Sequence, residues 1–417
     1  MKIKNKDLKI KHKNLKQIIV AIFFILAISY ASEEFIPERL HVQKKIFIFV
    51  ALVGFFGWLY KNFKRTKNKY WLVLIWLYIP FVLAMFYTLL TCSINGDQIG
   101  TTKQAITTTM FLVVDFFVTI ALIILFDKNA IKVMTLSLLG AYVYIILLKI
   151  CEIGVTDTIG QLLGKEIERN DIGIAVVPLL LYYFFIYFVK KNASKSNLIS
   201  IFFLLAVMFF CAKRSAILSI VVGIFLILMS KYTGKNSTTL LKIISVLTLL
   251  GSFLFVICIH IGALDLILAG KGTLSDRLYV WEYFSGMYEI SPLYLGKGFG
   301  FVHRYMVAGL GTDMVNDYVY LHNSILQIYI ETGFFGFLFW TGIYLILIPY
   351  IALKKYGRRS CDFTIISMVS MFAMFTVDNN LTYPLYQVCL CCSLYSLYRL
   401  EELEQLQGMR IKNGLNI

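Results

Sequence analysis

The chain has 417 residues, of which 59% are hydrophobic and only 15% are charged. A soluble domain of this length cannot bury so much apolar side chain in one core, so the composition excludes an ordinary soluble protein and indicates a membrane protein. The formal net charge of +16 does not indicate nucleic-acid binding, because the basic residues are spread over short polar segments between long apolar runs. The charge therefore carries information on membrane topology.

Apolar runs of about 20 residues recur along the chain, and each is long enough to cross a bilayer. The basic N-terminus leads into such a run without a convincing cleavage site, so we expect this run to be retained as a helix rather than removed as a signal peptide. The sequence predicts an all-α, polytopic integral membrane protein with a single membrane domain over residues 1–417. About twelve membrane helices are expected, at residues 17–32, 45–60, 70–91, 105–126, 131–150, 171–189, 198–212, 215–230, 242–262, 324–350, 363–379 and 384–399.

The predicted orientation follows from the basic residues. Most of the 40 Lys and Arg residues lie in the two tails and in every second connection, which places both termini in the cytoplasm by the positive-inside rule. The long connection 264–321, between the ninth and tenth helices, is then extracytoplasmic, and so is the turn at Lys213 and Arg214. The acidic tail at Glu401–Glu404 is expected to be a solvated cytoplasmic helix end.

The segment 264–321 is expected to carry the active site, because every other connection is short and this one has its own aromatic, glycine and ionisable content. It ends at His322 and Asn323, where the next apolar helix begins. A histidine there can act as a general base, whereas a structural interpretation makes either residue a helix cap. Glu331, deeper in the same helix, either assists the histidine or pairs with another helix.

Three arginines and a lysine are candidates for binding an anionic substrate. Lys213 and Arg214 have no acid beside them, so they predict a phosphate site, with snorkelling to lipid headgroups as the alternative. Arg277 and Trp281 are four residues apart and share a face if the segment is helical. Their pairing can be a structural cation–π contact or part of a substrate site. Arg304 is a further candidate for substrate binding.

The glycine run Gly296, Gly298 and Gly300 alternates with Lys297 and Phe299. A dinucleotide-binding loop would need a preceding strand and a following helix in a βαβ unit, and the sequence predicts neither. The run is therefore interpreted as a tight turn, with Lys297 as an optional anion contact.

The order of these elements resembles the O-antigen ligase and polymerase family. An arginine at a short outer turn is followed by a large loop with an Arg-x-x-x-Trp element and a Pro-Leu-x-x-Gly-x-Gly-x-Gly-like stretch that begins at Pro292. A His-Asn pair then opens a helix with the motif Gln-Ile-x-Ile-Glu-Thr-Gly-x-x-Gly, at Gln327–Gly336. The motif-bearing part covers about residues 205–340, and the combination in this order is more specific than any one motif.

The resemblance implies a GT-C-like membrane glycosyltransferase of the bacterial plasma membrane that needs no metal or cofactor. Such a polymerase transfers a growing glycan from undecaprenyl pyrophosphate to a new lipid-linked repeat unit of an O-antigen, capsule or exopolysaccharide. The resemblance also implies roles for three residues. Arg214 would hold the pyrophosphate leaving group, Arg277 would be a second arginine near the phosphates, and His322 would activate the acceptor hydroxyl. The implied partners are lipid-linked oligosaccharide, membrane lipid, a chain-length regulator and a flippase, and not nucleic acid.

Two alternatives stay open at the level of the sequence. A ligase of the same family would transfer the finished glycan to another acceptor, and nothing in the loop identifies the acceptor. A flippase of the lipid-linked repeat would need charged residues deep in several helices, along a central path. The deep charges here are few, mainly Asp115 and Glu331, so the polar loop favours an enzyme over a transporter.

Overall fold

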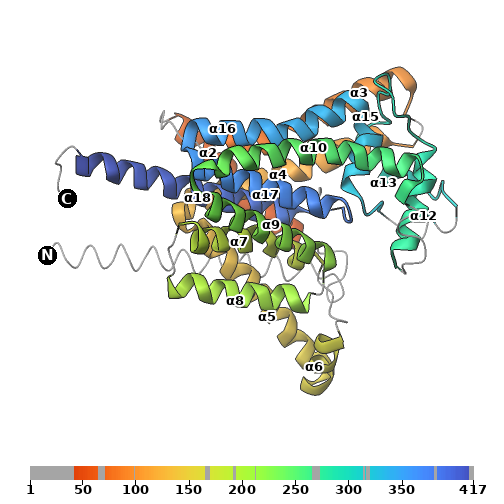
Figure 1. Ribbon diagram of the computed structural model, residues 1–417. Coiled ribbons are helices and arrows are strands. Elements are labelled where there is room, and N and C mark those ends of the chain that lie inside the picture. Colours follow the sequence, from red (N-terminus) through yellow and green to blue (C-terminus); the bar gives the residue numbers. More distant parts are fainter. Residues whose placement is uncertain are drawn as a thin grey trace. The chain divides into compact units, whose positions relative to one another are not determined.

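The computed structural model describes residues 42–63, 71–97, 99–164, 170–190, 194–211, 213–264, 273–312, 315, 320–379 and 383–412. Every regular element in these ranges is helical, which confirms the prediction of an all-α protein (Figure 1). The predicted span 17–32 lies outside the described residues. The chain divides into two compact units: unit 1 is Met1–Asn68, Val114–Ile217 and Leu385–Ile417, and unit 2 is Lys69–Val113 and Leu218–Pro384.

Unit 1 is built from α2 (Val42–Phe63), the second half of α4 (Thr101–Phe126), the 3-10 turn η2 (Asp127–Asn129), α5 (Ala130–Ile153), α6 (Val155–Gly164), α7 (Asn170–Phe188), α8 (Lys195–Phe210), the first turn of α9 (Arg214–Thr233) and nearly all of α18 (Pro384–Lys412). Helix α7 packs against α8, and both pack against α5. Gly54 of α2 lies so close to α4 that a Cβ atom would overlap the carbonyl oxygen of Phe117. Small residues permit such close helix approach inside a membrane.

Ion pairs join the second half of α18 to the rest of unit 1. Lys190 Nζ lies 2.6 Å from a carboxylate oxygen of Glu401 and 2.9 Å from one of Glu404. Arg399 Nε lies 3.2 Å from Asp127 Oδ1. Glu401 is buried, so the expectation of a solvated acidic helix end is wrong for this residue. The reason is the Lys190 side chain, which is only 3% exposed and needs an opposite charge beside it.

Unit 2 is built from α3 (Trp71–Asn95), the first half of α4, most of α9, the 3-10 turn η3 (Gly234–Asn236), α10 (Ser237–His260), α12 (Thr273–Ser285), α13 (Phe301–Val307), α15 (Ser324–Gly342), the π-helical turn η4 (Ile343–Leu347), α16 (Ile348–Tyr356) and α17 (Arg358–Phe375). Helix α17 packs against α10 and α16. Helix α12 contacts α10, and α13 contacts α15. The described part of the predicted loop 264–321 therefore includes α12 and α13, which rest on long helices of the same unit (Figure 1).

Four helical stretches of the described residues are long and apolar enough to cross a membrane: Val73–Ile94, Thr101–Ile153, Arg214–His260 and Ser324–Tyr356. Three shorter apolar helices, Ile48–Tyr60, Ile172–Phe188 and Lys195–Phe210, also coincide with predicted spans. The predicted turn between the seventh and eighth spans is present, because α8 ends at Phe210 and α9 begins at Arg214. The number of twelve spans, their orientation and the single membrane domain stay predictions.

An aromatic core centred on Trp340 holds α15 in unit 2. Its indole lies 4.5 Å, between ring centroids, from Tyr344, 5.9 Å from Phe372 and 6.3 Å from Phe81. These partners come from η4, α17 and α3, and all of them are buried. Burial of such large rings stabilises the C-terminal part of α15, where Trp340 lies.

Candidate active site

Helix α15 is interrupted at Gly333, whose backbone has φ 71° and ψ −172°. Side chains other than glycine essentially never adopt this conformation. The interruption also lets another segment approach, because a Cβ atom on Gly333 would overlap the carbonyl oxygen of Tyr294. A Cβ atom on Gly296 would in turn lie 2.5 Å from the backbone nitrogen of Gly333. The glycine run and the Glu-Thr-Gly motif are more than 30 residues apart in the sequence, but their backbones are in direct contact.

Backbone hydrogen bonds fix this contact. The three bonds run from Lys297 N–H to Ile330 O at 2.9 Å, from Gly298 N–H to Glu331 O at 2.9 Å and from Phe334 N–H to Tyr294 O at 3.0 Å. They satisfy carbonyl and amide groups that the break in the helix leaves without helical partners. Gly296, Gly298 and Gly300 all have positive φ, at 85°, 99° and 88°. The interpretation of the glycine run as a tight turn is therefore confirmed.

Helix α12 holds two separate segments of the candidate site. Arg277 Nη1 donates to the carbonyl oxygen of Val377 at 2.7 Å, and Trp281 Nε1 donates to that of Leu321 at 2.8 Å. The two residues share a helix face, as their spacing predicted. Among the described side chains, however, we find no cation–π contact between them. Each instead binds the backbone next to a polar residue: Leu321 precedes His322, and Val377 precedes Asp378.

His322 and Asp378 face each other at the centre of this arrangement. His322 Nδ1 lies 3.5 Å from Asp378 Oδ1. The Asp378 side chain is 1% exposed, whereas that of His322 is 27% exposed. The backbone of His322 has φ 51°, a left-handed conformation that is uncommon for residues other than glycine and that clusters at functional sites. Because Nδ1 lies on the side of the buried carboxylate, the opposite ring nitrogen, Nε2, lies on the side away from it.

Asn323 is the helix cap that the structural interpretation expected. Its side-chain oxygen accepts a hydrogen bond from Leu326 N–H at 3.0 Å, and its own N–H donates to Asn379 Oδ1 at 3.0 Å. Ser324 donates from both its N–H and its hydroxyl to the carbonyl oxygen of Asp378, at 3.2 and 3.0 Å. The turn after α17 and the start of α15 are thus held together at several points, which fixes the imidazole and the carboxylate relative to each other.

Arg304 binds the connection between α3 and α4. Its Nε donates to the carbonyl oxygen of Ile99 at 3.0 Å, and its guanidinium packs over Gly100. Its neighbour His303 stacks on Tyr320, with ring centroids 5.1 Å apart and an interplanar angle of 16°. Helix α13 therefore links the 99–100 connection to the segment that leads into His322. A contact of Arg304 with substrate stays a prediction.

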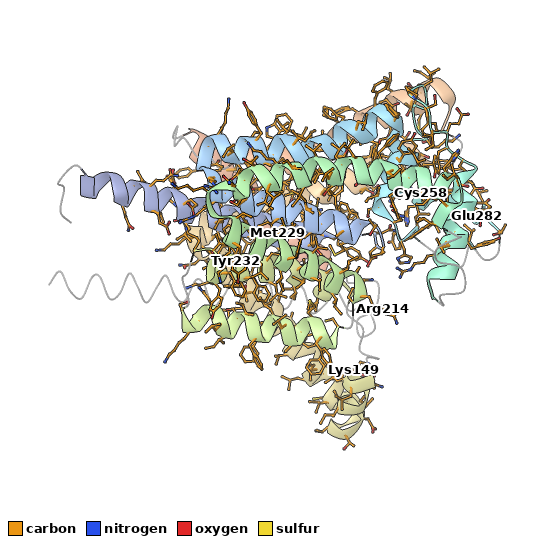
Figure 2. All side chains as sticks on the ribbon, viewed as in Figure 1. Lys149, Arg214, Met229, Tyr232, Cys258 and Glu282 are labelled. Atoms are coloured by element: carbon orange, nitrogen blue, oxygen red, sulfur yellow. The ribbon has the colours of Figure 1, made fainter. Side chains whose placement is uncertain are left out.

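Lys213 and Arg214 lie in unit 1, whereas the other predicted site residues lie in unit 2. Arg214 is the first residue of α9 and is exposed (Figure 2). The turn before it packs directly on α7, because a Cβ atom on Gly173 would lie 2.9 Å from Cys211 Cβ and 3.4 Å from Lys213 Cβ. Close packing of this turn limits the positions that the two cations can adopt.

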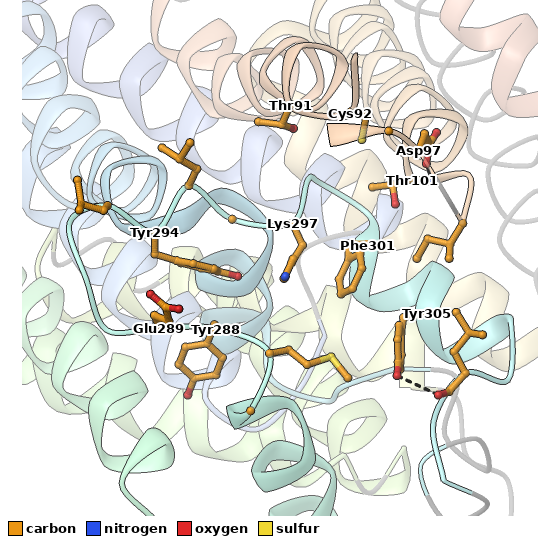
Figure 3. Close-up of a pocket in the computed structure, with 18 residues that line it drawn as sticks. Thr91, Cys92, Asp97, Thr101, Tyr288, Glu289, Tyr294, Lys297, Phe301 and Tyr305 are labelled. Atoms are coloured by element: carbon orange, nitrogen blue, oxygen red, sulfur yellow. Dashed lines mark hydrogen bonds between the residues drawn. The ribbon is translucent and has the colours of Figure 1, made fainter. Parts of the chain in front are cut away.

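A cavity of about 840 Å³ opens in unit 2 beside α13 (Figure 3). Aromatic side chains line much of it, among them Tyr288, Tyr294, Phe301 and Tyr305. Figure 3 shows the Lys297 side chain directed into the cavity. Aromatic rings suit the C–H faces of sugars, and an ammonium group suits an anion. The cavity therefore has the chemistry of a glycan site.

Some polar groups of the cavity wall are hydrogen-bonded to other groups of the protein. Tyr305 Oη donates to the carbonyl oxygen of Leu310 at 2.9 Å (Figure 3), and it lies 2.9 Å from the hydroxyl of Tyr283. Burial and the hydrogen bond with Tyr283 raise the pKa of Tyr305 to about 12. Partial burial acts to raise the pKa of Asp97, but hydrogen bonds from the start of α4 outweigh it and hold this pKa below its ordinary value. Glu289 is exposed on the same wall.

Sequence reasoning missed Asp378 and Asn379. The sequence predicted a membrane helix over 363–379, but α17 ends at Phe375. The signal was present as the polar sequence Asp-Asn-Asn that begins at Asp378, because such residues are costly inside a span and mark functional positions. Among the described residues, no group of three His, Cys, Asp or Glu side chains could hold a metal ion. The predicted independence from metals stays a prediction.

The family model described as O-antigen ligase matches residues 199–341. This stretch contains Arg214, Arg277, His322 and the interruption of α15 at Gly333. A comparison with curated proteins found no match. The match confirms the resemblance seen in the sequence: the chain carries an O-antigen ligase domain, consistent with the O-antigen ligase and polymerase family. Together with the apolar helices, the match indicates a multi-pass membrane enzyme of this type.

Proposed function

We propose that the protein is a polysaccharide polymerase. It transfers a growing glycan from undecaprenyl pyrophosphate to a new lipid-linked repeat unit, on the outer face of the bacterial plasma membrane. The product is an O-antigen, a capsule or an exopolysaccharide. The proposal rests on the pair of His322, which lies inside the matched stretch, and Asp378, which follows it in the chain; α12 and the start of α15 hold the pair together.

In this proposal, His322 is the general base. Its Nε2 removes the proton from the acceptor hydroxyl as the hydroxyl oxygen attacks the anomeric carbon of the donor sugar. The Asp378 carboxylate, 3.5 Å from Nδ1, orients the imidazole and stabilises the imidazolium that forms. The left-handed backbone at His322 and the bond from Trp281 to Leu321 fix the position of the ring.

The arginines act on the leaving group. The new bond joins the acceptor oxygen to the anomeric carbon, the bond from that carbon to the pyrophosphate oxygen breaks, and undecaprenyl pyrophosphate leaves with the electron pair. Positive charge near the departing oxygens lowers the barrier. Arg277 donates one N–H to Val377 O, and a guanidinium has five such donors. We assign Arg277 to the pyrophosphate, and on the family resemblance alone we assign Arg214, with Lys213 beside it, to the same leaving group.

A ligase is the second candidate, because the matching family model is described as O-antigen ligase. The chemistry at His322, Asp378 and the arginines would be the same. Only the acceptor would differ, since a ligase transfers the glycan to an acceptor other than a lipid-linked repeat unit.

The test is a glycosyl-transfer assay with purified protein and a synthetic repeat unit on undecaprenyl pyrophosphate. We expect a ladder of products from the native protein and no ladder from His322→Ala or Arg214→Ala. Arg359→Ala is the matched control, because this exposed arginine lies in the first turn of α17 on the predicted cytoplasmic side, and it should give the native ladder. Transfer to an added acceptor without a ladder would identify a ligase. Movement of the lipid across vesicles without any transfer would identify a flippase and contradict the proposal.

A further inference from the structure

Glu331 has a buried carboxyl group that the proposed mechanism does not use. The residue lies in α15, shortly before the break at Gly333, and is 0% exposed. Its Oε1 accepts hydrogen bonds from Val302 N–H and from Gln327 Nε2, both at 3.1 Å. Among the described residues, its Oε2 has no hydrogen-bond partner. Burial of a carboxyl group with one unsatisfied oxygen costs free energy that a hydrocarbon side chain would not, so the role of Glu331 should lie in the groups that it binds.

The hydrogen bond from Val302 joins α13 to α15. Val302 lies in the first turn of α13 and is buried. The glycine run reaches the same residue of α15 through the backbone, because Gly298 N–H donates to the carbonyl oxygen of Glu331 at 2.9 Å. Glu331 therefore binds the chain on both sides of Gly300, once with its backbone and once with its side chain. This contact matches the expectation that Glu331 pairs with another helix.

Helix α13 leads from this hydrogen bond to the candidate base. His303, next to Val302, stacks on Tyr320, with ring centroids 5.1 Å apart. Tyr320 lies in the segment that enters His322. The left-handed backbone of His322 is a conformation that persists only where the surrounding structure holds it. A displacement of α13 would move His303, and with it the segment that places the imidazole of His322.

We propose that Glu331 is a positioning residue for glycosyl transfer. Its carboxyl group holds the first turn of α13 against α15, and the stack of His303 on Tyr320 passes this position on to His322. Glu331 itself neither binds the substrate nor takes the proton. The reaction that it serves rests on the proposed function, whereas the path from Glu331 to Tyr320 rests on the contacts.

The test compares three substitutions of Glu331 by kcat and KM in the glycosyl-transfer assay. Glu331→Leu removes the acceptor of the Val302 N–H and should lower kcat about 10–100-fold with little change in KM, because small displacements of a reacting group have effects of this size. Glu331→Gln keeps an oxygen at the same place and should restore most of kcat. Glu331→Asp draws the oxygens back by one carbon–carbon bond and should give an intermediate kcat. Glu282→Leu is the matched control, because Glu282 is exposed on α12 (Figure 2), and its kcat should be native.

Two measurements separate positioning from a general loss of stability. The pH profile of kcat for Glu331→Leu should keep its native shape, because His322 stays the base. Loss of the limb that reports the base would make Glu331 itself the base and overturn the proposal. Tyr320→Leu breaks the stack with His303 and should lower kcat by itself. Combined with Glu331→Leu, it should lower kcat no further than the slower single variant, and fully additive losses would overturn the path through α13.

The remaining outcomes also decide the proposal. A folded Glu331→Leu protein with native kcat, or a Glu331→Gln protein as slow as Glu331→Leu, would overturn it. If Glu331→Leu does not fold, Glu331→Asp and Tyr320→Leu test the same path. Absence of glycosyl transfer by the native protein would refute the polymerase instead, and amide hydrogen exchange would then decide on the contacts. Faster exchange across α13 in Glu331→Asp than in the native protein would support the tie between α13 and α15, and equal exchange would overturn it.

Discussion

Replacement of Gly333 by alanine tests the contact between the glycine run and the interrupted helix α15. The new methyl group would overlap the carbonyl oxygen of Tyr294 and lie 2.7 Å from the backbone nitrogen of Gly296. Both obstacles are backbone atoms, so no rotation of a side chain can relieve the overlap. The loop must move away, or α15 must change its path at this residue.

The cost can be estimated from the structure. A residue other than glycine at φ 71° and ψ −172° is strained by about 1–3 kcal/mol. Displacement of the loop would break the three backbone hydrogen bonds between the two segments, each of which contributes about 1 kcal/mol. The expected loss of unfolding free energy is therefore about 4–6 kcal/mol. That is a large part of the stability of an ordinary domain, which is about 5–15 kcal/mol.

The measurement is denaturant unfolding of the purified protein in detergent micelles, followed by tryptophan fluorescence. Gly342→Ala is the matched control, because Gly342 lies in the same helix and a Cβ atom there meets nothing within 4 Å. Alanine at that position should be neutral or should stabilise the protein by about 1 kcal/mol. Equal stability of Gly333→Ala and Gly342→Ala would refute the backbone contact.

Three further predictions concern other parts of the chain. Lys190→Met should lower the unfolding free energy by about 3 kcal/mol, because it leaves Glu401 buried without its partner, and the added change Glu401→Gln should restore part of the loss. Trp281→Phe should cost only about 1 kcal/mol of stability but should lower kcat, because the bond that positions Leu321 is lost; an unchanged kcat would contradict this. The folded protein holds the pKa of Asp97 below its ordinary value. The charged form of Asp97 therefore stabilises the fold above that ordinary value, and this stabilisation is lost as pH falls through the folded-state pKa. The difference in Tm between the native protein and Asp97→Asn should therefore shrink as pH falls below about 4, the ordinary pKa of an aspartate. A constant difference would contradict a stabilising role of the Asp97 charge at the start of α4.

The helices were the most predictable part of the protein. Runs of about 20 apolar residues require helices in lipid, since every backbone group must be bonded within its own segment. The break at Arg214 followed from the cost of two cations inside a span. The start of α15 at Asn323 followed from the preference of asparagine for helix caps, and the structure shows that cap.

The partners of the candidate residues were not predictable. Asp378 meets His322 across 56 residues of sequence, and Trp281 reaches Leu321 across 40 residues. Contacts at such separations depend on how whole helices pack, and a single sequence does not show which helices pack together. The predicted helix over 363–379 also concealed Asp378, because its end was placed by hydropathy alone.

In the proposed mechanism, His322 and Asp378 act together as the base for glycosyl transfer. Its most direct test is the initial rate of transfer for the native protein, His322→Ala, Asp378→Asn and the double variant, with folding checked by thermal unfolding. We predict that His322→Ala lowers the rate by about 10²–10⁴-fold. We also predict that Asp378→Asn lowers it less and that the double variant is no slower than His322→Ala, because the carboxylate acts only through the imidazole. A folded His322→Ala protein with a rate close to native, or a double variant with fully additive losses, would contradict this mechanism.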